Sequence, residues 1–271
     1  MSNLALFYHF YTPLHFGSGT TLSYVDLPVQ RESHTDYPVM PSTGIKGVFR
    51  ACYEMVKGED KAEKLFGKGD EEGELIFTDG KILFFPVKSA RGVFVWITCP
   101  HVLERIKRDM GIINANIELN FNNITFDNDE QAFVLDDSIL VNNYLILEEL
   151  SFQKKNNIDF KWLENIALDI DKRKIAIIPN DMFKFFVKNS TEINARIRID
   201  QEKGTVDEGA LWYEELVPAE SVFYSLVLKR KEGSMKEFSD FVTKDNTGIF
   251  QFGGDETLGR GFAKVTVLNG R

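Results

Sequence analysis

One aspartate stands among residue types that can cleave a phosphodiester. Asp26 lies in residues 22–28 (Leu-Ser-Tyr-Val-Asp-Leu-Pro), close in sequence to His15, Arg31 and His34. A carboxylate can act as a general base towards a ribose 2′-OH, or hold a divalent ion beside a scissile phosphate. A histidine can move a proton near neutral pH. A turn residue is the commoner use of a single Asp in a loop, and either histidine can equally be a polar group of the core, so both interpretations stay open.

A stretch near the C-terminus combines glycines with a hydroxyl and a cation: Gly253, Gly254, Thr257, Gly259, Arg260 and Gly261. Glycine lets the backbone approach another group closely, and arginine adds a permanent positive charge. A phosphate would fit such a turn. The stretch is not a P-loop, because the Gly-Lys-Ser/Thr ending is missing and a strand is expected next. A tight turn between two strands is the alternative.

A helix expected from about residue 44 to residue 56 is a second candidate for phosphate binding. Residues 41–43 (Pro-Ser-Thr) precede it and offer capping chemistry, with Thr43 at its start. A helix N-terminus presents free N–H groups and the positive end of the helix dipole. Lys46 and Arg50 would lie one turn apart on one face. Taken alone, however, two such residues are commonly a solvated helix face.

A basic hairpin is expected within residues 191–216. Apolar and polar residues alternate there, in the order Ile193, Asn194, Ala195, Arg196, Ile197, Arg198 and Ile199. This period of two predicts a strand with one polar, basic face. Residues 201–204 supply a turn, and residues 205–213 can return as the partner strand. The hairpin is long and two-faced, so we expect it to project from the body.

The remaining elements indicate an α+β protein in which helices cover one face of an antiparallel sheet. Strands and helices alternate, but without the spacing of a doubly wound sheet, and a ferredoxin-like core is the commonest arrangement of this kind. Residues 114–157 are rich in Asn and Asp and show no clear period, which predicts an insertion.

Composition constrains the partners and the compartment. The formal net charge of −9 argues against a uniformly basic nucleic-acid-binding surface. Acidic residues concentrate in residues 59–74 and 127–137, which leaves room for a basic groove elsewhere. No apolar run approaches the roughly 20 residues that span a bilayer. Cys52 and Cys99 lack the spacing of a zinc or disulfide framework, so we expect reduced thiols in a cytoplasmic protein.

Several blocks together resemble a known family. Residues 14–19 (Leu-His-Phe-Gly-Ser-Gly) and 24–32 (Tyr-Val-Asp-Leu-Pro-Val-Gln-Arg-Glu) are similar to the N-terminal signature of the backbone RAMP subunits of Cmr-type (type III-B) CRISPR complexes. Residues 45–50, 196–212, 218–226 and 253–261 resemble the later blocks of that family, in the expected order.

The resemblance implies a single RAMP domain over residues 1–271, with a ferredoxin-like (RRM-like) palm and residues 191–216 as a thumb. Guide RNA, complementary target RNA, copies of the chain in a helical filament and other Cmr subunits are the implied partners. Asp26 would be the catalytic residue of target cleavage and would hold a divalent metal, expected to be magnesium, with His15 assisting. RNA contacts are expected from Gly17, Ser18, Gly19, Arg31, Thr43, Lys46, Arg50, Arg196, Arg198, Gly253, Gly254, Thr257, Gly259 and Arg260.

Two alternatives accompany this interpretation. The first is a purely structural subunit that binds guide RNA and has no nuclease activity, in which case Asp26 serves the fold. The second is a small-molecule enzyme whose glycine turn at residues 253–261 holds a nucleotide phosphate. Cleavage of guide-matched RNA in magnesium, compared with EDTA, distinguishes a nuclease from the purely structural subunit. Thermal shifts with nucleotides, compared with RNA co-purification, distinguish an RNA-binding protein from the small-molecule enzyme.

Overall fold

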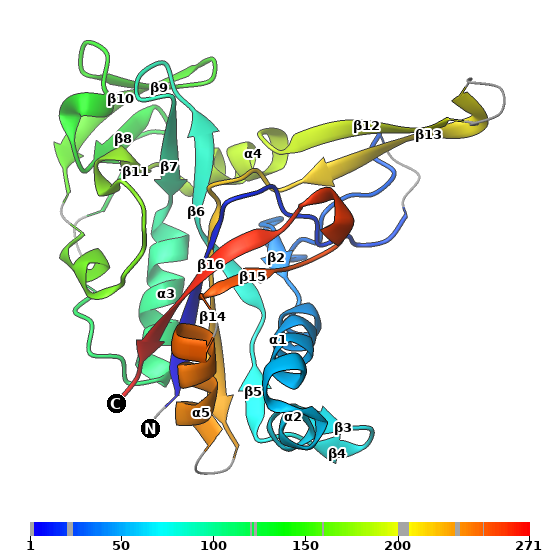
Figure 1. Cartoon of the computed structure of the whole chain (residues 1–271). Helices are drawn as coiled ribbons and strands as arrows, with labels where there is room; N and C mark the ends of the chain where they lie inside the picture. The colour runs from blue at the N-terminus through cyan, green and yellow to red at the C-terminus, as the bar shows by residue number, and fades with distance from the viewer. Residues whose placement is uncertain are drawn as a thin grey trace.

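The computed structural model describes most of the chain (Figure 1). The described residues are 3–20, 24–119, 121, 124–158, 160–199, 206–230, 234–245 and 247–271. The predicted hairpin turn at residues 201–204 lies outside them. Within the described ranges, no helix is long and apolar enough to cross a membrane.

One large sheet organises the molecule (Figure 1). Its strands run in the order β15–β16–β1–β14–β6–β7–β11–β8–β10–β9, with β2 paired to β6 and β5 paired to β14. Their bounds are β1 Leu4–Phe10, β2 Val39–Met40, β5 Leu75–Phe77, β6 Gly80–Lys88, β7 Phe94–Thr98, β8 Gln131–Val134, β9 Tyr144–Leu147, β10 Leu150–Asn157, β11 Ile175–Ile177, β14 Val222–Lys229, β15 Ile249–Gln251 and β16 Phe262–Asn269.

The sheet is mixed, so the expectation of an antiparallel sheet is wrong at one end. β7 and β11 are parallel, and so are β8 and β10. Parallel neighbours need a long crossover. Between β7 and β11 the chain supplies one that contains α3 (Pro100–Ile112) and the strands β8, β9 and β10.

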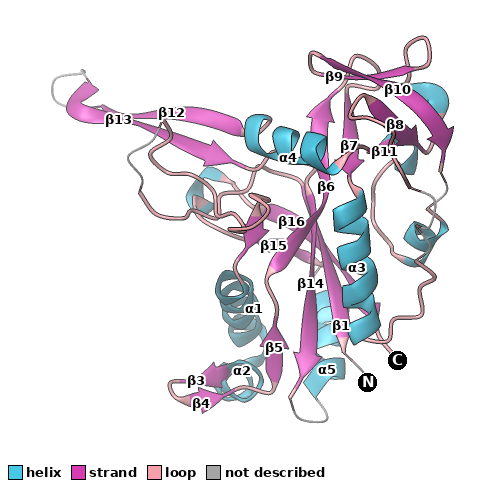
Figure 2. Cartoon of the chain, turned by 180° about the vertical axis from the view of Figure 1, so that it is seen from behind, coloured by secondary structure: helices cyan, strands magenta, loops and turns pink. Residues whose placement is uncertain are grey.

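Helices cover both faces of the sheet, which corrects the prediction of one covered face. α5 (Ser234–Asp240) lies in front of the strands in Figure 1, close to α1 (Ser42–Lys57) and α2 (Glu59–Phe66), whereas α3 lies in front in Figure 2. The reason is visible in β1, whose seven residues are all buried. A strand that is apolar on both sides needs a layer on each side.

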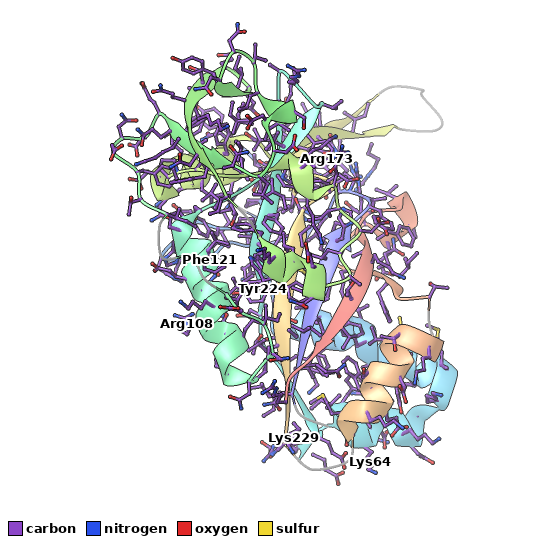
Figure 3. The ribbon with its side chains drawn as sticks, turned by 90° about the vertical axis from the view of Figure 1, so that its left-hand side faces the viewer. Lys64, Arg108, Phe121, Arg173, Tyr224 and Lys229 are labelled. Atoms are coloured by element: carbon purple, nitrogen blue, oxygen red, sulfur yellow. The ribbon has the colours of Figure 1, made fainter. Side chains whose placement is uncertain are left out.

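Different chemistry fills the two sides of the sheet. On the α1 and α5 side, the ring of Phe49 meets those of Phe238 and Phe252 edge-on, with centroids 5.3 and 5.6 Å away. On the α3 side, the Tyr224 hydroxyl donates a hydrogen bond to Asp109 Oδ2 at 2.9 Å. Figure 3 labels Tyr224 and Arg108, the residue before Asp109 on α3.

The region predicted as an insertion, residues 114–157, contributes strands to the main sheet. Besides β8, β9 and β10 it contains the short helix η1 (Asp137–Ile139), and η2 (Lys161–Asn165) and η3 (Lys172–Lys174) follow it. The free edge of β9 returns to the end of β6, because Ala90 N donates to Ile146 O at 3.1 Å and Glu148 N donates to Lys88 O at 2.8 Å. The strands from β6 to β9 in the sheet order therefore close into a ring.

Two strands project from this body as a hairpin (Figures 1 and 2). α4 (Asn180–Asn189) leads into β12 (Glu192–Ile199), which pairs antiparallel with β13 (Val206–Leu216) in a sheet of its own. A second small hairpin, β3 (Gly67–Lys68) with β4 (Glu71–Glu72), follows α2. Two short helical segments complete the set of elements: η4 (Phe241–Asp245), before β15, and η5 (Glu256–Leu258), between β15 and β16.

Candidate nucleic-acid interface

Asp26 lies at the root of the projecting hairpin, on the edge of β13 that β12 leaves open. Its backbone N donates to Tyr213 O at 3.1 Å, and its carboxylate Oδ2 accepts from Tyr213 N at 2.7 Å. Leu27 forms a parallel bridge to Glu214 one residue further along. The aspartate is partly exposed. One carboxylate oxygen is therefore fixed by the hairpin's own backbone.

Three segments meet at this root: two that are close in sequence near the N-terminus, and the end of β13, about 200 residues further along the chain. Gly17 bridges Val29, and Ser18 N donates to Pro28 O at 3.0 Å, so the Gly17–Ser18 loop lies beside the Asp26 segment. Leu14 exchanges both backbone hydrogen bonds with Val217, at 2.8 and 2.9 Å. The structure thus brings Gly17 and Ser18, two of the residues predicted to contact RNA, close to Asp26. Gly19 follows at the exposed end of the loop with a φ of 93°.

His15 is buried between these segments, with 8% of its surface exposed. Its Nδ1 lies 2.8 Å from Glu215 O and donates a hydrogen bond to that carbonyl. Its Nε2 lies 3.9 Å from Glu214 Oε1, and its own carbonyl accepts from Gly254 N at 2.8 Å. His15 therefore joins the N-terminal loop, β13 and the glycine turn, and its ring faces the protein.

Arg196 is engaged by two carboxylates of the same chain. Its guanidinium lies 3.6 Å from Glu214 Oε2 and 3.3 Å from Asp255 Oδ1, which links the hairpin to the glycine turn. Glu214 is only 3% exposed. Burial, and next the hydrogen bond and charge of Asp255, raise the pKa of the Glu214 carboxyl above its usual range, although His15 and Arg196 act in the opposite direction.

Arg31 also points into the protein. Its Nη2 pairs with Glu215 Oε1 at 2.5 Å, and its Nη1 donates to the carbonyls of Asp36 and Val187 at 2.8 and 2.9 Å. Only 19% of its side chain is exposed. The residue predicted to contact RNA therefore binds three groups of its own chain.

The glycine turn serves two purposes. A Cβ on Gly253 would collide with His15 O, and one on Gly261 would collide with Phe252 O. Both have positive φ, 85° and 76°, so these two glycines are required by the fold itself. Gly254 and Gly259 meet no such obstacle, and Thr257 between them is exposed. Only this outer part of the turn is open to a ligand.

The N-terminus of α1 already carries a carboxylate. Pro41 is the residue before the helix and no side chain of the 41–43 segment caps it, so the predicted local cap is wrong. Instead Asp79 Oδ1, 37 residues away, accepts from Ser42 N at 2.7 Å. The Ser42 N–H group, which could otherwise bind an external anion at the positive end of the helix, is therefore already hydrogen-bonded to a carboxylate of the chain. Thr43 at this end is exposed.

Lys46 and Arg50 line an open cleft of about 410 Å³ on the outer side of α1. Thr43 and Gly47 contribute to the same wall. The other wall consists of Phe66 at the end of α2 and residues 67–72 of the β3–β4 hairpin, which include Lys68 and the acids Asp70, Glu71 and Glu72. Arg50 Nε lies 3.9 Å from Glu54 Oε2 on the same helix. A Cβ on Gly47 would meet nothing within 4 Å, so the helix backbone is accessible there.

Arg198 and Arg260 occupy different settings. Arg198 is exposed on β12 towards the end of the projecting hairpin. Arg260 is partly buried behind the glycine turn. Burial raises the pKa of the nearby Glu192 carboxyl above its usual range, and the charge of Arg260 only partly offsets this. The opposite face of the hairpin is apolar and about half exposed, at Ile193, Ile197 and Leu211. The hairpin therefore has a polar face turned towards Asp255 and an apolar face turned to solvent.

Two groups of predicted residues result. The first group lies at the hairpin root and consists of Asp26, His15, Gly17, Ser18, Arg31, Arg196, Gly253 and Gly254. Thr43, Lys46 and Arg50 line the α1 cleft. The groups adjoin, because a Cβ on Gly44 at the start of α1 would touch the Phe16 ring. Gly19, Arg198, Thr257, Gly259 and Arg260 lie on the loops and strand around them.

The sequence interpretation missed the carboxylates that hold the root together, Glu214, Glu215 and Asp255, and also missed Asp79 at the N-terminus of α1. A signal was present for the first two. Two consecutive acids stand before an apolar Leu-Val pair in a strand. A carboxylate that becomes buried needs a cation or hydrogen-bond donors, so the pattern indicated that each acid has such a partner, although not which residue it is.

A single carboxylate at Asp26 is compatible with magnesium. Among the described residues, no three His, Cys, Asp or Glu side chains gather in a way that could hold a metal ion by themselves. Mg²⁺, however, usually keeps several waters and takes one or two carboxylates together with substrate phosphates. Asp26 uses Oδ2 for Tyr213 N, which leaves Oδ1 for such a shared ion.

Comparison with known proteins identifies the family. The sequence profile of the RAMP superfamily matches residues 8–264. The chain therefore belongs to the RAMP superfamily.

Within that superfamily the chain is similar to proteins called Cmr4. It is 41% identical to "CRISPR system Cmr endoribonuclease Cmr4" of Pyrococcus furiosus, over 94% of this chain and 92% of that protein. The crystal structure of oligomeric Cmr4 from Pyrococcus furiosus matches with a TM-score of 0.75 and 32% identity, covering 98% of each chain. A chain of the type III-B Cmr-beta complex bound to cognate target RNA has the same fold, with a TM-score of 0.81 at 22% identity, covering 98% of this chain and 97% of that one.

Proposed function

We propose that this chain is the repeating backbone subunit of a type III-B (Cmr) CRISPR effector complex. It binds guide RNA, assembles with copies of itself and with other Cmr subunits, and cleaves the target RNA that pairs with the guide. The observation that carries this proposal is the 41% identity, over nearly the whole chain, to a protein named as a Cmr endoribonuclease. The family's loop aspartate corresponds to Asp26, which here lies against the hairpin root.

The proposed architecture has a ferredoxin-like palm and a thumb. The large sheet with α1 and α3 on opposite faces is the candidate palm, and β12 with β13 is the candidate thumb. A thumb that enters the guide–target duplex distorts one nucleotide step, and the step next to its root is then presented to Asp26. Because Asp26 is hydrogen-bonded to Tyr213 on the thumb itself, its carboxylate has a fixed position relative to the nucleotide step that the thumb distorts.

The proposed reaction is internal transesterification. Asp26 assists deprotonation of the ribose 2′-OH, whose oxygen attacks the adjacent phosphorus while the 5′-oxygen leaves. The products are a 2′,3′-cyclic phosphate and a 5′-OH. Asp26 Oδ1 faces the substrate, since Oδ2 accepts from Tyr213 N. His15 contributes by holding the N-terminal loop, β13 and the glycine turn in register, because its Nδ1–H is donated to Glu215 O.

A divalent metal, which we take to be magnesium, would be held by Asp26 together with RNA oxygens, and would neutralise charge on the phosphate. The protein's own cations at the root are paired with Glu214, Asp255 and Glu215. This pairing supports the need for an external cation at the scissile phosphate.

The guide strand is assigned to the α1 cleft. Lys46 and Arg50 lie there beside the accessible backbone of Gly47, in a cleft of about 410 Å³. Lys and Arg contacts to phosphates fix a strand without reading its sequence, so base pairing supplies the specificity. The exposed Thr257 and Gly254 of the glycine turn are proposed as further RNA contacts.

The test is cleavage of a guide-matched RNA by the assembled complex. Wild type should cut in magnesium and not in EDTA, and Asp26→Asn should bind the target normally without cutting it. Equal cutting by wild type and Asp26→Asn would contradict the assignment of Asp26. No cutting by wild type in magnesium would instead support the purely structural subunit. Stabilisation by free nucleotides, with no RNA in the purified protein, would favour the small-molecule enzyme.

A further inference from the structure

Glu215 has an unusual set of contacts for a residue of a projecting strand. It is 6% exposed, and its two carboxylate oxygens accept three hydrogen bonds. Oε2 accepts from Val29 N at 2.9 Å. Oε1 accepts from Arg31 Nη2 at 2.5 Å and from the Thr191 hydroxyl at 2.9 Å. The side chain therefore joins the segment that follows Asp26 to the start of β12.

The backbone of Glu215 joins two more segments. Its N donates to Leu27 O at 3.0 Å, and its carbonyl accepts from His15 Nδ1 at 2.8 Å. Leu27 directly follows Asp26. One residue of β13 therefore contacts the Asp26 segment at positions 27, 29 and 31, and contacts the N-terminal loop as well.

Arg31 completes the arrangement from the other side. Besides Glu215 it reaches the carbonyls of Asp36 and Val187, so it ties the Asp26 segment to the loop that follows it and to α4. Its pairing inside the protein gives this arginine a role other than binding phosphate. A guanidinium presents its donors in a rigid fork, which fixes the relative orientation of the groups it joins.

Asp26 itself is hydrogen-bonded to the thumb through the backbone of Tyr213, two residues before Glu215, and Leu27 N also donates to Tyr213 O at 3.1 Å. Beyond Leu27, the contacts of residues 29 and 31 with β13 are made by the Glu215 side chain. Glu215 and Arg31 therefore extend the register that Tyr213 begins, over residues 27–31. In a reaction that needs an in-line geometry, a displacement of about 1 Å can cost on the order of 100-fold in rate.

We propose that Glu215, paired with Arg31, is a positioning residue that sets the place of Asp26 relative to the thumb. This inference rests on the proposed function. It assigns Arg31 to the geometry of cleavage in place of RNA contact, and it assigns a purpose to a buried acid that touches no substrate.

The informative variants keep the fold and change the pairing. In Glu215→Gln an amide N–H₂ replaces one acceptor, so one of the donors Val29 N and Arg31 Nη2 loses its partner. Arg31→Lys retains the charge but loses the fork. With saturating guide-matched complex, we expect the single-turnover cleavage rate constant to fall about 10- to 100-fold in each. Target affinity should change by less than about 3-fold, because neither residue contacts the strand.

Asp109→Asn is the matched control. Asp109 is another buried carboxylate, 2% exposed, whose Oδ2 pairs with Lys81 Nζ at 2.6 Å on the α3 side of the sheet. It makes no contact with residues 26–31 among the hydrogen bonds of the described chain. We expect its melting temperature to drop as in Glu215→Gln while its cleavage rate constant stays that of wild type. The double variant Arg31→Lys/Glu215→Gln should cleave no more slowly than the slower single variant, because the pair acts as a unit.

Glu215→Gln and Arg31→Lys that are folded and cleave at the wild-type rate would overturn the proposal. So would parallel losses of cleavage and target affinity, which would make these residues RNA contacts. Should Glu215→Gln fail to fold, Arg31→Lys gives the decision alone. Failure of wild type to cut, or cutting by Asp26→Asn, would refute the proposed function instead, so the two failures are distinguishable.

Discussion

The hairpin root and the α1 cleft both contain cations that the sequence assigned to RNA, yet they use them differently. At the root, Arg31 and Arg196 are paired with Glu215, Glu214 and Asp255. In the cleft, Lys46 and Arg50 face an open space of about 410 Å³, and the nearest carboxylate to Arg50 is 3.9 Å away on its own helix. The root is built for rigidity and the cleft for contact.

The difference bears on how an acidic protein can bind RNA. Each internal pair of an arginine and a carboxylate adds nothing to the net charge of −9, and it removes that arginine from contact with RNA. Binding therefore depends on where the open cations lie, because the total charge does not give the potential at one surface. Substitutions at the root should therefore reduce stability or geometry, whereas those in the cleft should reduce affinity.

The largest expected effect sharpens this comparison within the glycine turn. Gly261→Ala should lower the free energy of unfolding by about 3 kcal/mol, because its Cβ would overlap Phe252 O at a φ of 76°. Gly254→Ala should leave stability almost unchanged, since its Cβ would lie 3.5 Å from His15 Cδ2. Urea unfolding of both variants measures the difference. Equal losses would mean that the outer turn is as constrained as the inner one.

The next effect concerns the cleft. Lys46→Ala/Arg50→Ala should weaken guide-RNA binding by about 10-fold near physiological salt and reduce the slope of log K against log salt by about 1.4, at roughly 0.7 per phosphate contact for a single strand. The melting temperature should not fall. Filter binding over a salt series measures this, with Lys107→Ala on the exposed side of α3 as control. An unchanged slope would remove the cleft from the RNA path.

A smaller effect is expected at Gly47, where one substitution should change the free energy of unfolding and the RNA affinity in opposite directions. Gly47 lies within α1, is exposed and has open space at its Cβ position. Gly47→Ala should therefore raise the free energy of unfolding by about 0.5–1 kcal/mol, as alanine is the better helix former. If the strand approaches this backbone, RNA affinity should fall in the same variant. A stabilised variant with unchanged affinity would show that the strand does not touch α1 there.

The smallest effect is a pH dependence at the root. Burial and Asp255 raise the pKa of Glu214 in the folded protein. Folded protein then holds this proton more tightly than unfolded protein, so the contribution of Glu214 to stability is greatest at low pH and is lost as pH rises through the raised pKa. The stability of Glu214→Gln relative to wild type should therefore increase between pH 4.5 and neutrality. Exposed Glu118→Gln, measured by urea unfolding at each pH, should show no such trend.

Local patterns predicted most local elements. The helix expected over residues 44–56 is α1, Ser42–Lys57, because its apolar stripe has the helical period. The alternation over residues 193–199 is β12, and the return strand runs to Leu216, three residues beyond the expected end. Residues 114–157 gave no period because β8 and β9 have only four residues each and the strands lie at the end of the sheet, where β8 pairs with both a parallel and an antiparallel neighbour.

Contacts between distant segments could not be predicted in the same way. Asp79 caps α1 from 37 residues away, and Glu215 binds Arg31 from 184 residues away. The residues next to Asp79 and Glu215 in the sequence do not indicate which residue each carboxylate will bind. The side-chain types predicted which residues could do chemistry. Which arginines pair with carboxylates of the chain, and which cations remain available to RNA, depends on the fold.

The most direct test of this division compares two variants in one assay. Dissociation constants for target and guide RNA and single-turnover cleavage rate constants are measured for complexes that carry Asp26→Asn or Lys46→Ala/Arg50→Ala. The account predicts that Asp26→Asn lowers the cleavage rate constant by on the order of 1,000-fold with unchanged affinity, within the range that a positioned acid or base contributes. The cleft variant should lose affinity and, once saturated, cleave like wild type. Loss of affinity in Asp26→Asn with cleavage retained at saturation, or the converse in the cleft variant, would contradict it.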